Sequence, residues 1–278
     1  MQNRRIYFRK MKILISDNLP DICKTILENA DFQVTTKTDF TPEELKEGIG
    51  KYDGLIIRSS TQCTPEIIEN ASKLRAICRA GVGVDNVDVP AATKKGIIVM
   101  NTPGGNTTST AEHTITLLLA LSRNIPQACN SVREGGWERK KFMGTQVSGK
   151  TLGMIGLGKI GKEVAKRAIA LEMRVLGYDP FVSNETIPKL NVQFVKNLDD
   201  IYKQADYITL HIPLVNETKN LISSREFALM KDGVRIINCA RGGILSEDAL
   251  YNALVSGKVA GAAIDVFEKE PPEGNKLL

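Results

Sequence analysis

Three polar residues follow apolar segments in the second half of the chain, at positions where strands of a parallel sheet would end. They are His211, Arg241 and Asp265. In open α/β sheets, ligands bind beyond the carboxyl ends of the strands. These three side chains are therefore candidates for a binding or catalytic site.

Arg241 has the neighbours that a ligand-binding arginine needs. The residues around it are small: Cys239, Ala240, Gly242 and Gly243. Small side chains let a ligand approach the backbone, and a guanidinium group binds a carboxylate through two parallel hydrogen bonds. A surface arginine in an ordinary turn is the alternative, and the small neighbours favour the ligand-binding role.

The next pattern is a glycine-rich turn. Residues 150–161 read KTLGMIGLGKIG, so that Gly156, Gly158 and Gly161 form G-x-G-x-x-G between an apolar strand and a helix. The first glycine allows a tight turn, the second lets the backbone approach a pyrophosphate, and the third lets helix and strand pack closely. The helix N-terminus adds free N–H groups and partial positive charge. Three glycines alone are a weak signal, but between a strand and a helix they predict a dinucleotide site.

Asp179 indicates which dinucleotide that site would hold. It ends the strand expected at 174–178, about 20 residues after the turn, where a carboxylate accepts hydrogen bonds from both ribose hydroxyls. The same carboxylate would repel a 2′-phosphate, and Pro180 and Phe181 supply no cation to receive one. We therefore predict NAD rather than NADP.

An NAD site that exchanges hydride with an alcohol also needs a group that carries the alcohol proton, most often histidine. The chain has two histidines. His113 lies in an apolar helical segment and is predicted to be a core or helix-face residue. His211 could line the cofactor cleft, but its position does not favour a direct catalytic role. Glu270 lies in an acidic loop where a solvated glutamate is expected, so the residues alone reveal no general acid or base.

Alternating apolar and amphipathic segments predict two α/β domains. The expected strands of the first are residues 12–17, 32–36, 53–57, 74–79 and 96–101, with helices between them, one presenting Ile22, Ile26, Leu27 and Ala30 on a single face. Further strands are expected at 151–155, 174–178, 191–195, 206–211, 233–238 and 260–265. Such alternation is typical of parallel sheets covered by helices on both faces. We predict a smaller domain at 11–103 and a Rossmann domain at 104–278.

Two connecting segments are distinctive. Residues 102–109 form a loop rich in glycine and hydroxyl groups, which leads into an apolar helix at 109–122 that could cross between the domains. Residues 135–144 are polar with isolated aromatic side chains. We interpret this second segment as a surface arm and a candidate subunit interface.

The composition is that of a globular protein without membrane spans. Hydrophobic residues make up 42% and charged residues 25% of the chain, and no apolar run approaches the roughly 18 residues that a membrane span needs. The net charge of +5 is scattered, which suits anionic small ligands and not nucleic acid. The five cysteines form no C-x-x-C and no metal-ligand spacing, so we expect reduced thiols, a cytoplasmic location and no metal site. Residues 1–10 are basic; an extended start is favoured over an organelle-targeting segment.

Several longer motifs together resemble the D-2-hydroxyacid dehydrogenase family over residues 12–272. The motifs are GLIIRS at 54–59, RAGVGVDNVD at 79–88, NTP at 101–103, WERKKFMG at 137–144, NCARGG at 238–243 and DVF at 265–267. The resemblance implies an NAD-binding Rossmann domain beside a flavodoxin-like substrate domain, which would close around the ligand. It also implies that a C-terminal segment returns to complete the substrate domain, and that segment is missing here.

The resemblance further implies roles for individual residues. Arg241 would orient the substrate carboxylate and polarise the carbonyl group, and Glu270 would hydrogen-bond the catalytic histidine and raise its pKa. Substrate phosphate and carboxylate would be held by residues matching Arg58, Arg79 and Asn106. The implied NAD contacts, besides the three glycines, are Val82, Lys159, Ile160, Asp179, Ile212, Cys239, Ala240 and Asp265.

The chain departs from the family pattern in three respects. Val82 and Ile212 stand where relatives often have threonine, so two hydroxyl contacts to NAD would be lost while backbone contacts could remain. The family's catalytic histidine belongs to a Pro-His-Leu-Gly-type segment beyond Glu270, and the chain ends at Leu278 before it. The helix that completes the substrate domain, and any regulatory C-terminal domain, are missing as well. The chain is then either a fragment or a protein that binds NAD without turnover.

The resemblance implies a function and leaves two rivals. The implied reaction is NAD-dependent oxidation of 3-phosphoglycerate to 3-phosphohydroxypyruvate in serine biosynthesis, by a homodimer. Arg58 and Arg79 favour this phosphorylated substrate over the glyoxylate, hydroxypyruvate or lactate of sister enzymes. The other rival is a non-catalytic NAD-binding interaction protein, for which the sequence shows no peptide-binding feature.

Overall fold

The computed structural model describes residues 9–182 and 191–278. The chain divides into two compact units, Met1–Asn106 and Thr107–Leu278, whereas the boundary expected from the sequence lay between residues 103 and 104. Most of the basic N-terminal segment, residues 1–8, lies outside the described part. Both units are parallel α/β structures, so the predicted fold class is confirmed.

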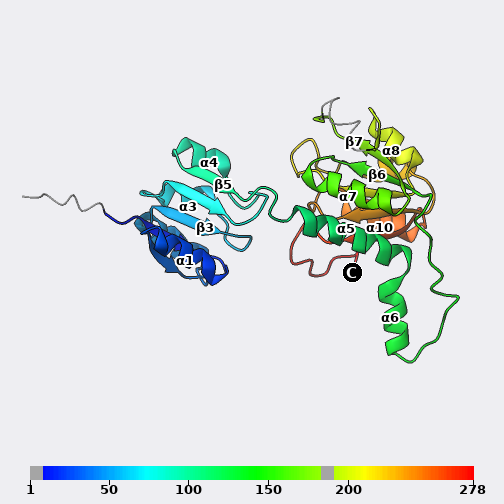
Figure 1. The fold of residues 1–278 in the computed structure, drawn as a ribbon, viewed down its shortest axis with the longest axis horizontal. Helices are drawn as coiled ribbons and strands as arrows, with labels where there is room; N and C mark the ends of the chain where they lie inside the picture. The colour runs from blue at the N-terminus through cyan, green and yellow to red at the C-terminus, as the bar shows by residue number, and fades with distance from the viewer. Residues whose placement is uncertain (1–8, 183–190) are drawn as a thin grey trace, which may run out of the picture. The chain divides into compact units, whose positions relative to one another are not determined.

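The first unit is a five-stranded parallel sheet with order β2-β1-β3-β4-β5 (Figure 1). Its strands are β1 (Lys12–Ile15), β2 (Gln33–Thr36), β3 (Gly54–Ile57), β4 (Ala76–Arg79) and β5 (Ile98–Asn101). Its helices are α1 (Asp21–Asn29), α2 (Pro42–Gly48), the short 3-10 helix η1 (Ile49–Lys51), α3 (Pro65–Asn70) and α4 (Val89–Lys94).

One face of this first sheet carries the hydrophobic core of the unit. Strand residues such as Leu14, Leu55 and Ile77 pack there against apolar side chains of α2 and α3. α2 begins as the sequence predicts, because Thr41 and Glu44 form a reciprocal capping box: each backbone N–H donates to the other residue's side chain.

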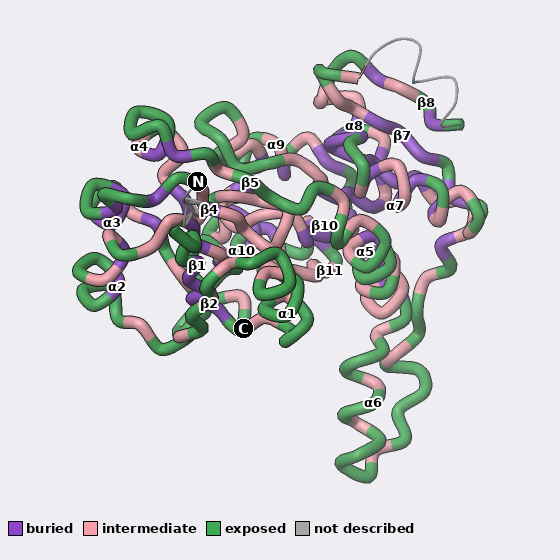
Figure 2. The backbone as a smooth tube through the Cα atoms, turned by 60° about the vertical axis from the view of Figure 1, so that its left-hand side comes forward, coloured by how far each residue is buried: buried purple, intermediate pink, exposed green. Residues whose placement is uncertain are grey.

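Helix α1 forms where its periodicity predicts, but its apolar face is not buried. Ile22 and Ile26 are both largely exposed, and no α1 residue is fully buried within the described part of the chain (Figure 2). Periodicity establishes that a helix is amphipathic, but it does not establish what covers the apolar side.

The second unit is a six-stranded parallel sheet with order β11-β10-β9-β6-β7-β8. Its strands are β6 (Thr151–Ile155), β7 (Arg174–Tyr178), β8 (Gln193–Phe194), β9 (Tyr207–Leu210), β10 (Val234–Asn238) and β11 (Val259–Ile264). Its helices are α5 (Thr107–Ser122), α6 (Ile125–Arg133), α7 (Lys159–Ala170), α8 (Leu198–Gln204), α9 (Ser224–Leu229) and α10 (Glu247–Val255).

Helices cover both faces of this second sheet. α5 and α7 contribute Ala111, Leu118 and Val164 to the core on one face. On the other face, α8, α9 and α10 contribute residues such as Ile201 and Leu250. The strand order reverses between β6 and β9, and such a switch point is where ligands of doubly wound sheets bind.

A helical arm projects from the second unit. α6 and the segment after it extend away from the sheet in both views (Figures 1 and 2). We did not expect α6 from the sequence, although Pro126 near its N-terminus and the spacing of Ile125, Cys129 and Val132 are typical of an amphipathic helix. In the part of the chain that the structure describes, no helix is both long and apolar enough to cross a membrane.

Candidate functional site

The glycine-rich turn joins β6 to α7 at the carboxyl edge of the second sheet. Gly156 has φ +99°, a conformation that side chains rarely adopt, and a Cβ there would meet the carbonyl of His211. A Cβ on Gly161 would meet the Gly156 carbonyl, so this glycine allows α7 to lie close to the turn. A Cβ on Gly158, in contrast, would point into open space. The turn thus leaves room for a ligand beside Gly158, at the N-terminus of α7.

Asp179 is tied to this turn. It follows β7, and its carboxylate accepts hydrogen bonds from the backbone N–H groups of Leu157 and Phe181, both at 2.8 Å. These bonds fix the carboxylate beside the turn, while each oxygen keeps a second lone pair. The geometry is suitable for accepting hydrogen bonds from ribose hydroxyls next to a pyrophosphate. Lys159 and Ile160, the other predicted contacts here, form the first turn of α7.

His211 follows β9 on the other side of the turn. Its Nε2 atom lies 3.0 Å from the Thr209 hydroxyl oxygen. Burial lowers the pKa of His211 to about 4, because the charged ring would lose its hydration. The ring is therefore neutral near pH 7 and is poorly suited to act as a proton acceptor. Ile212, a predicted cofactor contact, comes next and would touch any Cβ on Gly156.

The loop that carries Arg241 is held by Asn238 at the end of β10. The Asn238 side chain donates to the Arg241 carbonyl at 2.9 Å and accepts from the Ala240 N–H at 3.0 Å. Gly242 lies so close to the Phe267 carbonyl that a side chain there would displace the chain. The Arg241 guanidinium also donates to the Ala240 carbonyl at 2.6 Å. The Asn238 side chain thus fixes the loop backbone that carries Arg241 at the carboxyl edge of the sheet.

Glu270 belongs to the segment after β11. Its Oε1 atom accepts a hydrogen bond from the Phe267 N–H at 3.0 Å, and the side chain is otherwise exposed. Glu270 therefore lies in the segment whose Phe267 carbonyl packs against Gly242, and Gly242 is the residue that follows Arg241.

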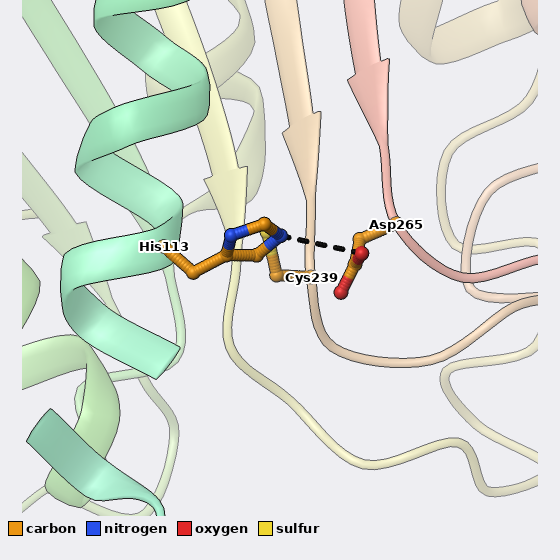
Figure 3. Close-up of side chains that lie close together, drawn as sticks. All are labelled: His113, Cys239 and Asp265. Carbon is orange, nitrogen blue, oxygen red and sulfur yellow. Dashed lines mark ion pairs between the residues drawn. The ribbon is translucent and has the colours of Figure 1, made fainter. Parts of the chain in front are cut away.

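Three side chains from three different elements converge at the same edge (Figure 3). His113 comes from α5, Cys239 follows β10 and Asp265 follows β11. The His113 Nε2 atom lies 3.2 Å from Asp265 Oδ1. Burial raises the pKa of the Cys239 thiol to about 11, and the thiol hydrogen-bonds with Thr114. At neutral pH the group is thus a histidine–aspartate pair above a protonated thiol.

The sequence assigned these three residues separately. Cys239 and Asp265 were predicted cofactor contacts, whereas His113 was predicted to lie in the core or on a helix face. The imidazole is 46% exposed, which agrees with the helix-face alternative, and it is directed at Asp265. In α5, His113 lies next to the buried positions Ala111 and Thr114, so the sequence places it at the border of the buried face. Only the tertiary fold identifies Asp265 as its partner.

The first unit has a separate cavity at the carboxyl ends of β3, β4 and β5. Its volume is about 340 Å³. The lining residues are Arg58, Ser59, Arg79, Ala80, Gly81, Val82, Thr102, Gly105 and Asn106. The three residues predicted to hold the substrate therefore line one cavity, together with Val82, a predicted cofactor contact. Two guanidinium groups suit a small ligand with more than one anionic group.

Arg79 has an unmet hydrogen bond inside this cavity. Its Nε atom is buried, and the described residues provide no acceptor for it. Its guanidinium lies against Gly81, where a Cβ would collide with it. Asn101 and Thr102 hold the loop around Gly81: Asn101 Nδ2 donates to the Val82 carbonyl at 2.6 Å, and the Thr102 N–H donates to the Gly81 carbonyl at 2.9 Å. A buried donor without an acceptor is a group that a bound anion or water would satisfy.

Two supporting residues were missed by sequence reasoning. Buried Asp17, just after β1, accepts hydrogen bonds from the Arg58 N–H and from the Thr61 hydroxyl, the latter at 2.7 Å. Asn86 Nδ2 donates to the carbonyls of Arg58 at 2.7 Å and Thr61 at 2.6 Å. Both therefore fix the loop that carries Arg58. Asp17 could have been found from the sequence, because it ends a predicted strand at the edge where ligands bind. Asn86 could not, because its partners are brought to it only by the tertiary fold.

Comparisons with known proteins agree with these features. A family described as D-isomer specific 2-hydroxyacid dehydrogenase, NAD binding domain, matches residues 115–278. A D-3-phosphoglycerate dehydrogenase of Archaeoglobus fulgidus is 52% identical over 268 residues, which are 96% of this chain and 51% of the relative. The chain thus spans about half the length of the curated relatives it matches first.

Solved structures with the same fold include one from Thermus thermophilus and one from Paecilomyes thermophila. The Thermus protein TT0316 superposes with a TM-score of 0.86 at 35% identity, over 95% of this chain and 85% of that one. A glyoxylate reductase of Paecilomyes thermophila superposes with a TM-score of 0.87 at 30% identity, over 95% and 84% of the two chains.

Proposed function

The chain belongs to the D-isomer specific 2-hydroxyacid dehydrogenase family, and on that basis we propose that it serves the NAD-dependent oxidation of 3-phosphoglycerate to 3-phosphohydroxypyruvate. This reaction belongs to serine biosynthesis. The observation that carries the proposal is the cavity that brings Arg58 and Arg79 together. The similarity to D-3-phosphoglycerate dehydrogenases over 96% of the chain supports the same substrate.

The cavity residues would divide the anionic groups of the substrate between them. A phosphate and a carboxylate each accept paired hydrogen bonds from a guanidinium group. The Arg79 Nε donor, for which the described residues provide no acceptor, supports a ligand with acceptor oxygens. Glyoxylate and lactate carry one carboxylate and no phosphate, so they would leave one guanidinium without an ionic partner.

The second unit would hold NAD at the carboxyl edge of its sheet. The open space at Gly158 and the N-terminus of α7 fit a pyrophosphate, and the fixed carboxylate of Asp179 fits the adenosine ribose. When bound, the nicotinamide ring would accept the hydride of the substrate. Asp179 supports NAD over NADP because it would repel a 2′-phosphate.

Arg241 and Glu270 would assist the reaction at the nicotinamide end. Arg241 would bind the substrate carboxylate and polarise the forming carbonyl. Glu270 would hydrogen-bond the histidine that takes the hydroxyl proton and keep its pKa raised. Neither histidine of the chain suits that role, because His211 is neutral and bonded to Thr209 while His113 pairs with Asp265. We therefore propose that a further histidine completes the site.

Two finer assignments belong to the same proposal. A homodimer is supported by the α6 arm, where Trp137 is 74% exposed and Met143 78% exposed. A cytoplasmic location is supported by five free cysteines, which stay reduced in that compartment.

Replacing Arg79 tests the substrate assignment. In the Arg79→Ala chain we expect binding of 3-phosphoglycerate, measured by calorimetry, to weaken at least about tenfold, because truncation removes a charged donor that the ligand would pair. Arg75→Ala is the matched control, since Arg75 is an exposed arginine next to the opposite end of the same strand. Binding of lactate should change less than binding of 3-phosphoglycerate.

Two results would count against this substrate. An equal loss for lactate and 3-phosphoglycerate would mean that Arg79 does not select a phosphorylated ligand. Unchanged 3-phosphoglycerate binding in Arg79→Ala would mean that the cavity is not its site.

A further inference from the structure

The histidine–aspartate pair lies where the fold would place the nicotinamide half of the cofactor. β6 and its glycine turn stand between Asp179, after β7, and Asp265, after β11, in the order β11-β10-β9-β6-β7-β8. A dinucleotide with its pyrophosphate at α7 and its adenosine ribose at Asp179 must extend its other half over β9, β10 and β11. Asp265 and Arg241 are at the ends of those strands.

The backbone of Asp265 is fixed, whereas its side chain has one identified contact. The Asp265 N–H donates to the Asn238 carbonyl of β10 at 3.0 Å. The carboxylate meets His113 Nε2 through Oδ1 at 3.2 Å, and in the described parts of the chain no other group pairs with it. Both side chains are about half exposed, 46% for His113 and 49% for Asp265. An exposed pair of this kind contributes little to stability. Its relevant feature is the second carboxylate oxygen, Oδ2, which can accept a hydrogen bond from a ligand.

The hydrogen-bonding chemistry identifies what that oxygen would accept. A carboxylate only accepts hydrogen bonds, so the His113 Nε2 atom must be the donor to Oδ1. Oδ2 is the carboxylate oxygen that His113 leaves unengaged (Figure 3). The carboxamide of nicotinamide offers two N–H donors. Thr114, the residue after His113, hydrogen-bonds with the buried Cys239 thiol, which joins α5 to the end of β10 beneath the pair.

We propose that His113 is a positioning residue of the NAD site: it orients the carboxylate of Asp265, which is already a predicted cofactor contact, so that this carboxylate can accept a hydrogen bond from the carboxamide N–H of NAD. The pair thereby selects dinucleotides that carry an amide on the pyridine ring. The inference rests on the NAD site of the proposed function, but not on which hydroxy acid is oxidised.

Calorimetric titration of the full chain tests this role with two ligands. The first is NAD, and the second is 3-acetylpyridine adenine dinucleotide, in which a methyl ketone replaces the amide and removes both N–H donors. His113→Ala should weaken NAD binding about fivefold to tenfold, the effect of losing one oriented hydrogen bond to a charged group. The same variant should bind the acetyl analogue within about twofold of the unchanged chain.

A conservative variant and a control separate positioning from structural damage. His113→Gln should restore NAD binding to within about twofold, because glutamine places an amide nitrogen the same number of bonds from Cβ as His113 Nε2. Thr116→Ala should leave both affinities unchanged, because Thr116 is on the exposed side of α5 and its hydroxyl donates to the Glu112 carbonyl of the same helix.

The remaining outcomes would overturn the proposal. Equal weakening for both ligands in His113→Ala, or no rescue by glutamine, would show a structural role only. A metal ion shared by His113, Cys239 and Asp265 would make NAD binding sensitive to EDTA, which the proposal excludes. Failure of the unchanged chain to bind NAD would contradict the cofactor site itself, and this result is distinct from an altered pattern among the variants.

Discussion

At the scale of single residues, His211 and His113 show how surroundings decide what an imidazole can do. His211 stands at a strand end beside the glycine-rich turn, but burial lowers its pKa to about 4 and its Nε2 atom lies 3.0 Å from the Thr209 hydroxyl. His113 is exposed and points at a carboxylate. Sequence position favoured neither as a proton carrier, and the structure supplies the physical reason: one ring is kept neutral and the other is paired.

The depressed pKa of His211 predicts a specific pH dependence of stability. The unfolded ring takes up a proton near pH 6.5 and the folded ring only near pH 4, so the unfolded state binds more protons between these values. The free energy of unfolding should therefore fall as the pH decreases from 6.5 to 4. Urea unfolding of the His211→Gln chain should show a smaller fall over this window than the unchanged chain. Parallel pH profiles for the two chains would show that burial does not suppress this protonation.

Residue-level prediction from sequence worked where a motif fixes the local geometry. Gly156, Gly161 and Asp179 lie as the glycine pattern predicts, since a positive φ, a close helix contact and a strand end are local consequences of sequence. Asp17 and Asn86 were missed, because their partners lie 25 or more residues away in the chain. Local patterns do not specify such contacts.

At the scale of elements, two helices bring the candidate site residues to the carboxyl edge of the second sheet. α7 begins directly after Gly158, and α5 brings His113 and Thr114 to the edge of β10 and β11. α6 was not predicted as a helix: its nine residues, Ile125–Arg133, carry only a short amphipathic pattern, and the isolated aromatic residues belong to the segment after it, residues 135–144. The apolar side chains of α6, such as Ile125 and Val132, are exposed in the structure, and the sequence alone does not show this.

The arm predicts an effect on assembly. If it forms the subunit interface, the unchanged chain should sediment as a dimer, and Trp137→Glu should shift it toward monomer, because a charge would then be buried at the contact. Val255→Ser, which alters an exposed apolar residue at the end of α10, should stay dimeric. An unchanged chain that sediments as a monomer would contradict the homodimer, as would a dimer that tolerates the Trp137 change.

At the scale of the whole molecule, the alternation of strands and helices was sufficient to predict two parallel sheets. The period of apolar residues differs between strand and helix, and parallel strands require crossover helices, so the fold class follows from local patterns. The exposed face of α1 marks where such reasoning ends. Ile22 and Ile26 have the spacing of a buried face, but burial depends on which element covers them, and no described element does.

The two sites also differ in what supports them. The proposed cofactor site rests on a motif, on the hydrogen bonds around Asp179 and on a family match over residues 115–278. The cavity with Arg58 and Arg79 rests on side-chain placement, and its substrate is a proposal. A direct test of the account should therefore begin with the cofactor.

The most direct measurement is calorimetric titration of the unchanged chain with NAD and, separately, with NADP. We predict that NAD binds and that NADP binds at least about tenfold more weakly, because the Asp179 carboxylate would face the extra phosphate. Equal binding of the two dinucleotides, or no binding of NAD, would contradict the central claim that this chain is built around an NAD site.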